Sequence, residues 1–106
     1  MSLYPPFLKW GKYKSTDPDK PDVLNIEVTE TDTFETEYSI CVVSKVDDEP
    51  MAIPLHNFGS NNLQCLNLWK KGIKVGKIKV GKKFRILTWK GISKNNFPIR
   101  RYDLVF

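Results

Sequence analysis

Apolar and polar side chains alternate between residues 23 and 31, where every second residue from Leu24 to Val28 is apolar. Because successive side chains of a β-strand point to opposite faces, this period of two predicts a strand with one face toward a core. Residues 29–36, which overlap the end of this segment, are polar apart from a lone Phe34. They are expected to form a connection.

Two more strands are predicted before the middle of the chain. Residues 38–46 are rich in β-branched side chains, which favour a second strand. The acidic stretch 47–50 then turns the chain, and residues 51–55 predict a short third strand. Pro54 has no amide hydrogen to donate, so the third strand is expected at an edge or to end there.

The pattern changes after the third strand. Apolar residues recur three apart from Leu63 to Trp69, a spacing that puts them on one face of a helix. The sequence therefore predicts a helix over residues 60–71. Ser60 is expected to cap its amino end, and Gly72 is expected to end it.

An exact tandem repeat follows, in which residues 73–77 and 78–82 both read Ile-Lys-Val-Gly-Lys. A continuous strand through a repeat of five would exchange its two faces between the copies. A bend or bulge is therefore expected at Gly76, at Gly81 or at both.

The last part of the chain predicts two strands, over residues 83–89 and 99–106, joined by a loop at 90–98. The element order of residues 23–106 is then strand, strand, strand, helix, strand, strand, and it resembles the OB-fold. The resemblance implies a mainly β, five-stranded barrel with one helix between strands 3 and 4. An SH3-like small barrel is the rival fold, and residues 1–22 are expected to form an amino-terminal arm and loop.

The length of 106 residues corresponds to a single domain. No stretch approaches the ~20 apolar residues of a membrane span, and no secretory signal is expected at the start of the chain. A cytoplasmic location and no membrane partner are therefore expected. Cys41 and Cys65 match no metal-binding spacing and are interpreted as small apolar core residues.

Charge is divided between the two halves of the chain. Residues 1–53 hold 5 Lys and Arg against 11 Asp and Glu, whereas residues 54–106 hold 12 against one. Aromatic residues are interleaved with these basic residues. A positive segment that can expose aromatic rings suits a polyanion with stackable bases. A compact fold could also cancel this field by placing the two halves side by side.

With residues 77–89 taken as extended, the odd positions form a basic stripe that ends in Trp89, and the even positions are mostly apolar. The stripe predicts binding of single-stranded DNA or RNA, largely without sequence preference. Residues expected to neutralise phosphates are Lys77, Lys79, Lys83, Arg85, Lys90, Lys94 and Arg101. Residues expected to stack on bases are Trp89, Phe97 and Trp10.

Each of these assignments has a simpler alternative. The lysines could form a solvated outer face, Phe97 could fold inward, and Trp10 could pack over a barrel end. The first hairpin loop, which often contacts the ligand in OB-folds, is acidic here. The binding surface would then be shifted. Alternatively, the chain is a protein-interaction module that binds an acidic partner or itself and no nucleic acid.

No constellation of residues indicates catalysis, a cofactor or a metal. His56 is the only histidine and has no nucleophile nearby in a known pattern. The aspartates of residues 17–22 lack the glycine and glutamate of a calcium loop. The spacing from Gly76 to Lys82 lacks the Ser or Thr of a phosphate-binding loop. A non-enzymatic protein is therefore expected.

Overall fold

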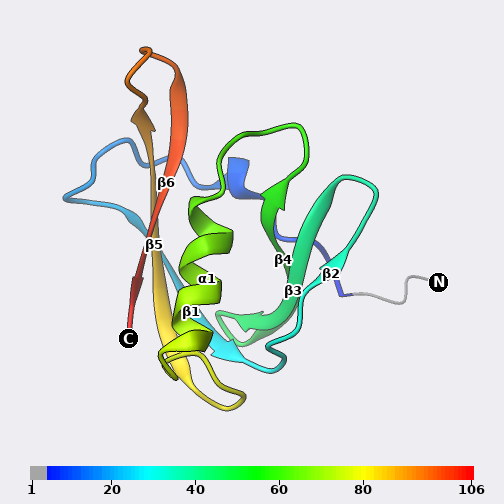
Figure 1. Cartoon of the computed structure of the whole chain (residues 1–106). Coiled ribbons are helices and arrows are strands. Elements are labelled where there is room, and N and C mark those ends of the chain that lie inside the picture. Colours follow the sequence, from blue (N-terminus) through cyan, green and yellow to red (C-terminus); the bar gives the residue numbers. More distant parts are fainter. Residues whose placement is uncertain (1–4) are drawn as a thin grey trace.

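The computed structural model describes residues 5–106 (Figure 1). Residues 1–4, which belong to the expected arm and to the segment where no secretory signal is expected, lie outside the described residues. The elements are a 3₁₀ turn η1 (Trp10–Lys12), strands β1 (Asp22–Val28), β2 (Phe34–Glu35), β3 (Ser39–Val46) and β4 (Glu49–Asn57), helix α1 (Gln64–Lys74), and strands β5 (Lys83–Ile92) and β6 (Pro98–Val105).

The strands form one antiparallel sheet in the order β2-β3-β1-β5-β6, with β4 paired to β3. The expectation of a mainly β fold with one helix is confirmed. The sheet is not closed into a barrel, because the strand pairs of residues 5–106 do not join β4 to β6. No helix in this range is long and apolar enough to cross a bilayer.

The segment that leads into α1 lies between β4 and β6 and covers the outer edge of β6. The Asn62 side chain donates from Nδ2 to the Arg100 carbonyl (2.7 Å) and accepts at Oδ1 from the Gln64 amide (3.2 Å). Gln64 Oε1 in turn accepts from the Tyr102 amide (2.9 Å). Two amide side chains thus satisfy backbone groups that a neighbouring strand would otherwise bind.

The amino-terminal arm covers the outer edge of β4. The Leu8 amide donates to the Ala52 carbonyl (2.8 Å), and the Ala52 amide donates to the Pro6 carbonyl (2.9 Å). The Trp10 indole Nε1 donates to the Pro54 carbonyl (2.7 Å). The arm therefore protects an edge that could pair with another chain, and it belongs to the folded domain.

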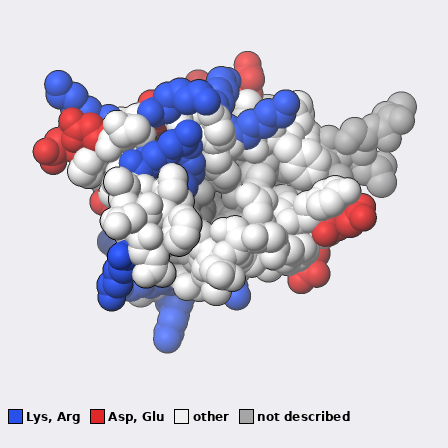
Figure 2. Space-filling view, turned by 90° about the horizontal axis from the view of Figure 1, so that it is seen from above, with Lys and Arg blue, Asp and Glu red and all other residues white. Residues whose placement is uncertain are grey.

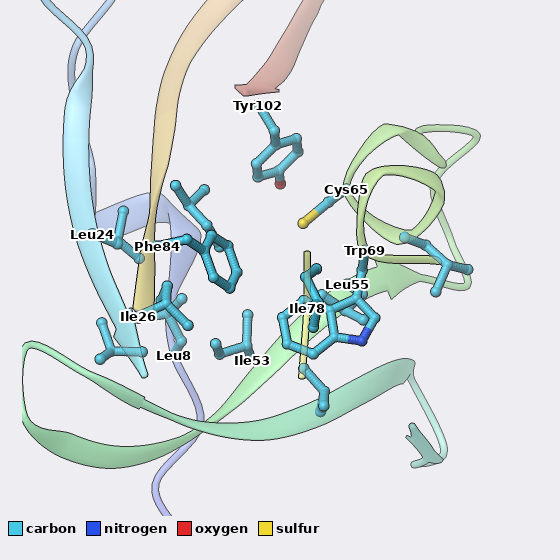
Figure 3. Packing of buried hydrophobic residues seen from close by; sticks show 14 of the residues in the cluster. Leu8, Leu24, Ile26, Ile53, Leu55, Cys65, Trp69, Ile78, Phe84 and Tyr102 are labelled. Carbon is cyan, nitrogen blue, oxygen red and sulfur yellow. The ribbon is translucent and has the colours of Figure 1, made fainter. Parts of the chain in front are cut away.

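One hydrophobic core lies between α1 and the inner face of the sheet (Figure 3). Trp69 is its largest fully buried side chain, only 1% exposed, and its ring lies 6.0 Å from that of Phe84. The buried residues of this cluster are Leu8, Trp10, Leu24, Ile26, Val28, Val42, Val46, Ile53, Leu55, Cys65, Leu66, Trp69, Ile78, Phe84, Ile86 and Tyr102. Burial of the alternate residues of β1 and β5 explains the period of two in these strands.

The helix and the repeat differ from their predictions. α1 begins four residues later than expected, its N-cap residue Leu63 makes no side-chain capping hydrogen bond, and the helix continues past Gly72 into the first copy of the repeat. The rest of the repeat is a loop, with φ of +77° at Gly76 and +90° at Gly81. Ile78 is buried between these two glycines and anchors the loop to the core. The predicted bends are present, but no strand runs through residues 77–82.

The connection around Phe34 also differs from its prediction, because Phe34 and Glu35 pair with β3 as the short strand β2. The third predicted strand is longer than expected, since β4 continues on both sides of residues 51–55. These additions extend the sheet without changing its order.

Gly72 packs closely against the loop that follows α1. A Cβ atom there would lie 2.7 Å from Ile78 Cγ1 and 3.2 Å from Phe106 Cζ. We expect Gly72→Ala to lower the free energy of unfolding by about 1 kcal/mol, because overpacking outweighs the better helix propensity of alanine. Urea unfolding measures this change. Gly59→Ala is the control, since a Cβ atom there meets nothing within 4 Å; equal effects of the two variants would contradict the close packing.

The buried thiol of Cys65 and the buried phenol of Tyr102 predict how the free energy of unfolding depends on pH. Burial raises the pKa of the Cys65 thiol from 9.0 to about 12 and also raises the pKa of the Tyr102 phenol. Above pH 9 the unfolded chain loses protons that the folded chain keeps, so the free energy of unfolding should fall as pH rises toward 12. Cys65 contributes a slope of up to ~1.4 kcal/mol per pH unit in this window.

Urea unfolding at several values between pH 8 and 11 measures the slope. The Cys65→Ala variant lacks the thiol, so its free energy of unfolding should fall less steeply as pH rises, whatever its absolute stability. The same slope in both proteins would exclude Cys65 as a source of the pH dependence.

Candidate nucleic-acid interface

The outer face of β5 carries the predicted basic stripe over part of its length. Lys83 and Arg85 are exposed, and Leu87 and Trp89 are partly exposed. The alternate residues Phe84, Ile86 and Thr88 are buried. The alternation expected for residues 83–89 is thus present, and it turns the two cationic side chains and the indole to the same side of the sheet.

Strand β6 adds one arginine to this face. Arg101 is the cross-strand partner of Trp89, and a Cβ atom on Gly91 would lie 3.2 Å from Arg101 Cγ. The glycine therefore leaves room for the arginine stem beside the indole. The neighbouring Arg100 points the other way, donating to Thr88 Oγ1 (3.1 Å) and to the Tyr13 carbonyl (2.8 Å).

The loop between β5 and β6 forms a tip that extends beyond the rest of the sheet (Figure 1). The Ser93 amide donates to the Phe97 carbonyl (2.8 Å), which closes the loop. Phe97 is 66% exposed and Ile92 is 70% exposed, and Lys94 is exposed between them. Phe97 does not fold inward, so its ring is available at the tip.

Four of the predicted residues do not join this face. Lys77 and Lys79 lie in the loop before β5, not on a strand with the stripe. Lys90 is exposed, but its position in the alternation of β5 turns it to the face opposite Trp89. Trp10 is only 9% exposed, and its ring packs 4.9 Å from that of Tyr102. This corrects the prediction for Trp10, because a buried indole offers no surface to a base.

Little of the positive charge is neutralised inside the fold. Glu27 lies 3.7 Å from both Lys45 and Lys83, and these are the only ion pairs within residues 5–106. The Arg85 guanidinium has no ion pair or hydrogen bond within that range. In the view of Figure 2, acidic side chains lie at the margins, and those at the left and at the top lie next to Lys and Arg side chains. The acidic half therefore neutralises part of this face, through the ion pair of Glu27 with Lys83, and leaves Arg85 unpaired.

The same face contains a groove of about 560 Å³ where β1, β5 and the carboxyl end of β6 meet the turn between β3 and β4. It is lined by Asn25, Ile26, Glu27, Asp47, Asp48, Lys83, Phe84, Arg85, Val105 and Phe106. Sequence reasoning predicted only Lys83 and Arg85 here, because it treated the two aspartates as a turn. The antiparallel pairing of β1 with β5 sets Asn25 opposite Arg85, and the sequence does not reveal that pairing.

The part of the chain that the structure describes contains no group of three or more His, Cys, Asp or Glu residues that could hold a metal ion. His56 is partly buried beside the Phe58 ring. In comparisons with known proteins, the chain matches no family model, no curated protein and no solved structure.

Proposed function

We propose that this protein binds single-stranded DNA or RNA through the outer face of β5 and β6, as a non-enzymatic cytoplasmic protein. The observation that carries the proposal is the pairing of Trp89 with Arg101 on a face that also holds Lys83 and Arg85. Ammonium and guanidinium groups neutralise phosphates, and the indole offers a flat surface to any base. The contacts of this stripe are largely independent of sequence.

Lys94 and Phe97 repeat the same chemistry at the tip of the hairpin, where both are exposed. The ten residues of β5 extend over roughly 33 Å at 3.3 Å per residue. A nucleic-acid strand bound along β5 would therefore contact Lys94 at the hairpin tip, Arg101 beside Trp89, and Lys83 and Arg85 at the beginning of β5.

We further propose that this sheet corresponds to the partly open barrel of an OB-fold. The pairing of β1 with both β3 and β5, and the helix between β4 and β5, support this reading, because OB-folds are partly open five-stranded barrels. In OB-folds the second and third strands bind the ligand, and these correspond here to β3 and β4. The arm pairs with β4 at Ala52, which favours a surface shifted to β5 and β6.

Titration with a single-stranded oligonucleotide, followed by tryptophan fluorescence, tests this function. Trp10 and Trp69 are buried, so quenching by a bound base reports on Trp89. We expect saturable quenching that weakens strongly between about 50 and 200 mM salt, because phosphate contacts release counterions. Absence of quenching at low salt, with no complex detected by light scattering, would overturn the proposal.

A protein-interaction module is the second candidate. Tyr38 is 73% exposed beside Glu37 in the turn that precedes β3, and the carboxylate of Glu37 makes no ion pair with described residues. Such a surface complements a basic one, including that of another copy. Sedimentation without nucleic acid distinguishes the candidates, since only this one predicts a mass that rises with protein concentration.

A further inference from the structure

The groove beside Arg85 combines three kinds of group within one concave surface. Lys83 and Arg85 provide positive charge along one wall, where Lys83 forms an ion pair with Glu27 (3.7 Å). Asp47 and Asp48 provide carboxylates from the β3–β4 turn, and Phe106 provides a half-exposed ring packed 5.2 Å from that of Phe84. Cations, acceptors and an aromatic ring correspond to the phosphate, edge and face of a nucleotide.

The two carboxylates of the β3–β4 turn differ in how they are used. Asp47 Oδ1 accepts from the Asn25 amide (3.2 Å) and from Asn25 Nδ2 (3.0 Å), so this side chain fastens the turn to β1. Asp48 has neither a hydrogen-bond nor an ion-pair partner among residues 5–106. Its carboxylate is therefore an unused acceptor at the margin of the groove.

The position of Asp48 has no advantage for a face that only binds phosphate. Asp47 and Asp48 have φ of +50° and +70° in a two-residue hairpin turn, where asparagine, aspartate and glycine are all favoured. Asparagine or glycine would satisfy the backbone at position 48 without a negative charge. A carboxylate there repels phosphate, unless it receives hydrogen bonds from a base.

We propose that this groove receives one guanine nucleotide of the bound strand. Guanine presents two adjacent donors, N1–H and the N2 amino group, which can pair with both oxygens of the Asp48 carboxylate. Thymine and uracil present one N–H between two carbonyl oxygens, which a carboxylate repels. Phe106 then contacts the base, and the unpaired Arg85 guanidinium contacts the adjoining phosphate.

This inference rests on the proposed function and adds a preference at one nucleotide to a face that otherwise binds without regard to sequence. The test compares (dT)₈ with the same strand carrying one central dG, for the wild-type protein, Asp48→Asn and Asp19→Asn. Asparagine is favoured at positive φ, so Asp48→Asn should fold normally. Asp19→Asn is the control, since it removes the same charge from an exposed loop outside the groove.

The wild-type protein should bind the dG strand at least about fivefold more tightly than (dT)₈, as expected for one bidentate contact to a base. Asp48→Asn should bring that ratio close to one, and Asp19→Asn should leave it unchanged. The ratio separates base recognition from repulsion of phosphate, which acts on both strands equally.

Tight binding of both strands with no preference for dG would overturn this inference and leave the proposed function in place. A preference that survives in Asp48→Asn would also overturn it. Failure of both strands to bind would overturn the proposed function, and this inference with it.

Discussion

Replacement of Trp69 by alanine is expected to lower the free energy of unfolding by about 3–5 kcal/mol. The side chain is fully buried, and its indole lies between α1 and β5, in contact with the Phe84 ring. Its Nε1 donates to the Thr31 carbonyl (3.4 Å), which joins the helix to the loop after β1. Removing the indole leaves a cavity and one unpaired carbonyl. Because small domains are stable by about 5–15 kcal/mol, this variant should be close to unfolding.

Urea unfolding followed by circular dichroism measures this loss. Trp69→Phe keeps an aromatic ring and should lose distinctly less stability. Lys70→Ala is the control, because its side chain is exposed on the same helix and the change should stay within about 0.5 kcal/mol. A Trp69→Ala variant as stable as Lys70→Ala would contradict the position of α1 against the sheet.

Replacement of Trp89 by alanine should weaken binding of a single-stranded oligonucleotide by about 5- to 150-fold, which corresponds to ~1–3 kcal/mol for one stacked base. The dependence of this affinity on salt should not change, because the indole carries no charge. Arg85→Ala should instead reduce the slope of log affinity against log salt by about 0.7, the value for one phosphate on a single strand. Fluorescence anisotropy of a labelled strand measures both, without relying on tryptophan.

Leu87→Ala is the matched control for this pair, since Leu87 lies between Arg85 and Trp89 on the same face. This variant should change the affinity by no more than a few-fold. It should leave the slope of log affinity against log salt unchanged. If Trp89→Ala and Arg85→Ala both bound like the wild-type protein, the outer face of β5 would not be the binding surface.

The predicted strands succeeded where one face of a strand is buried. β1, β3 and β6 begin and end within about three residues of their predictions. In β1 and β5 the burial follows the period of two, so the sequence carries the information locally. The short strand β2 leaves no such pattern, because only two of its residues pair.

The repeat shows where local pattern is insufficient. Ile73 and Ile78 hold the same place in the two copies, yet Ile73 lies in α1 and Ile78 is a buried anchor in a loop. Identical pentapeptides therefore differ through tertiary contacts, chiefly the packing of Ile78 against Gly72. No propensity could distinguish the two copies.

The candidate site was predictable for the same reason as the strands, and only to the same extent. The alternation of β5 correctly grouped Lys83, Arg85 and Trp89. Trp10 could not be assigned from the sequence, since its burial depends on the Pro54 carbonyl 44 residues away. The groove depends on the pairing of β1 with β5, which is likewise non-local.

The edge-covering arm has a consequence for the kinetics of folding. The β3–β4 and β5–β6 hairpins join neighbouring segments and can form early, whereas β1 pairs with β5 across about sixty residues. The arm packs against both the β4 edge and Tyr102, so it cannot make all of its native contacts until both are folded. Domains dominated by such distant contacts fold in milliseconds to seconds. The Trp10 indole should therefore acquire its native environment in the last phase of refolding, after Trp69 has become buried.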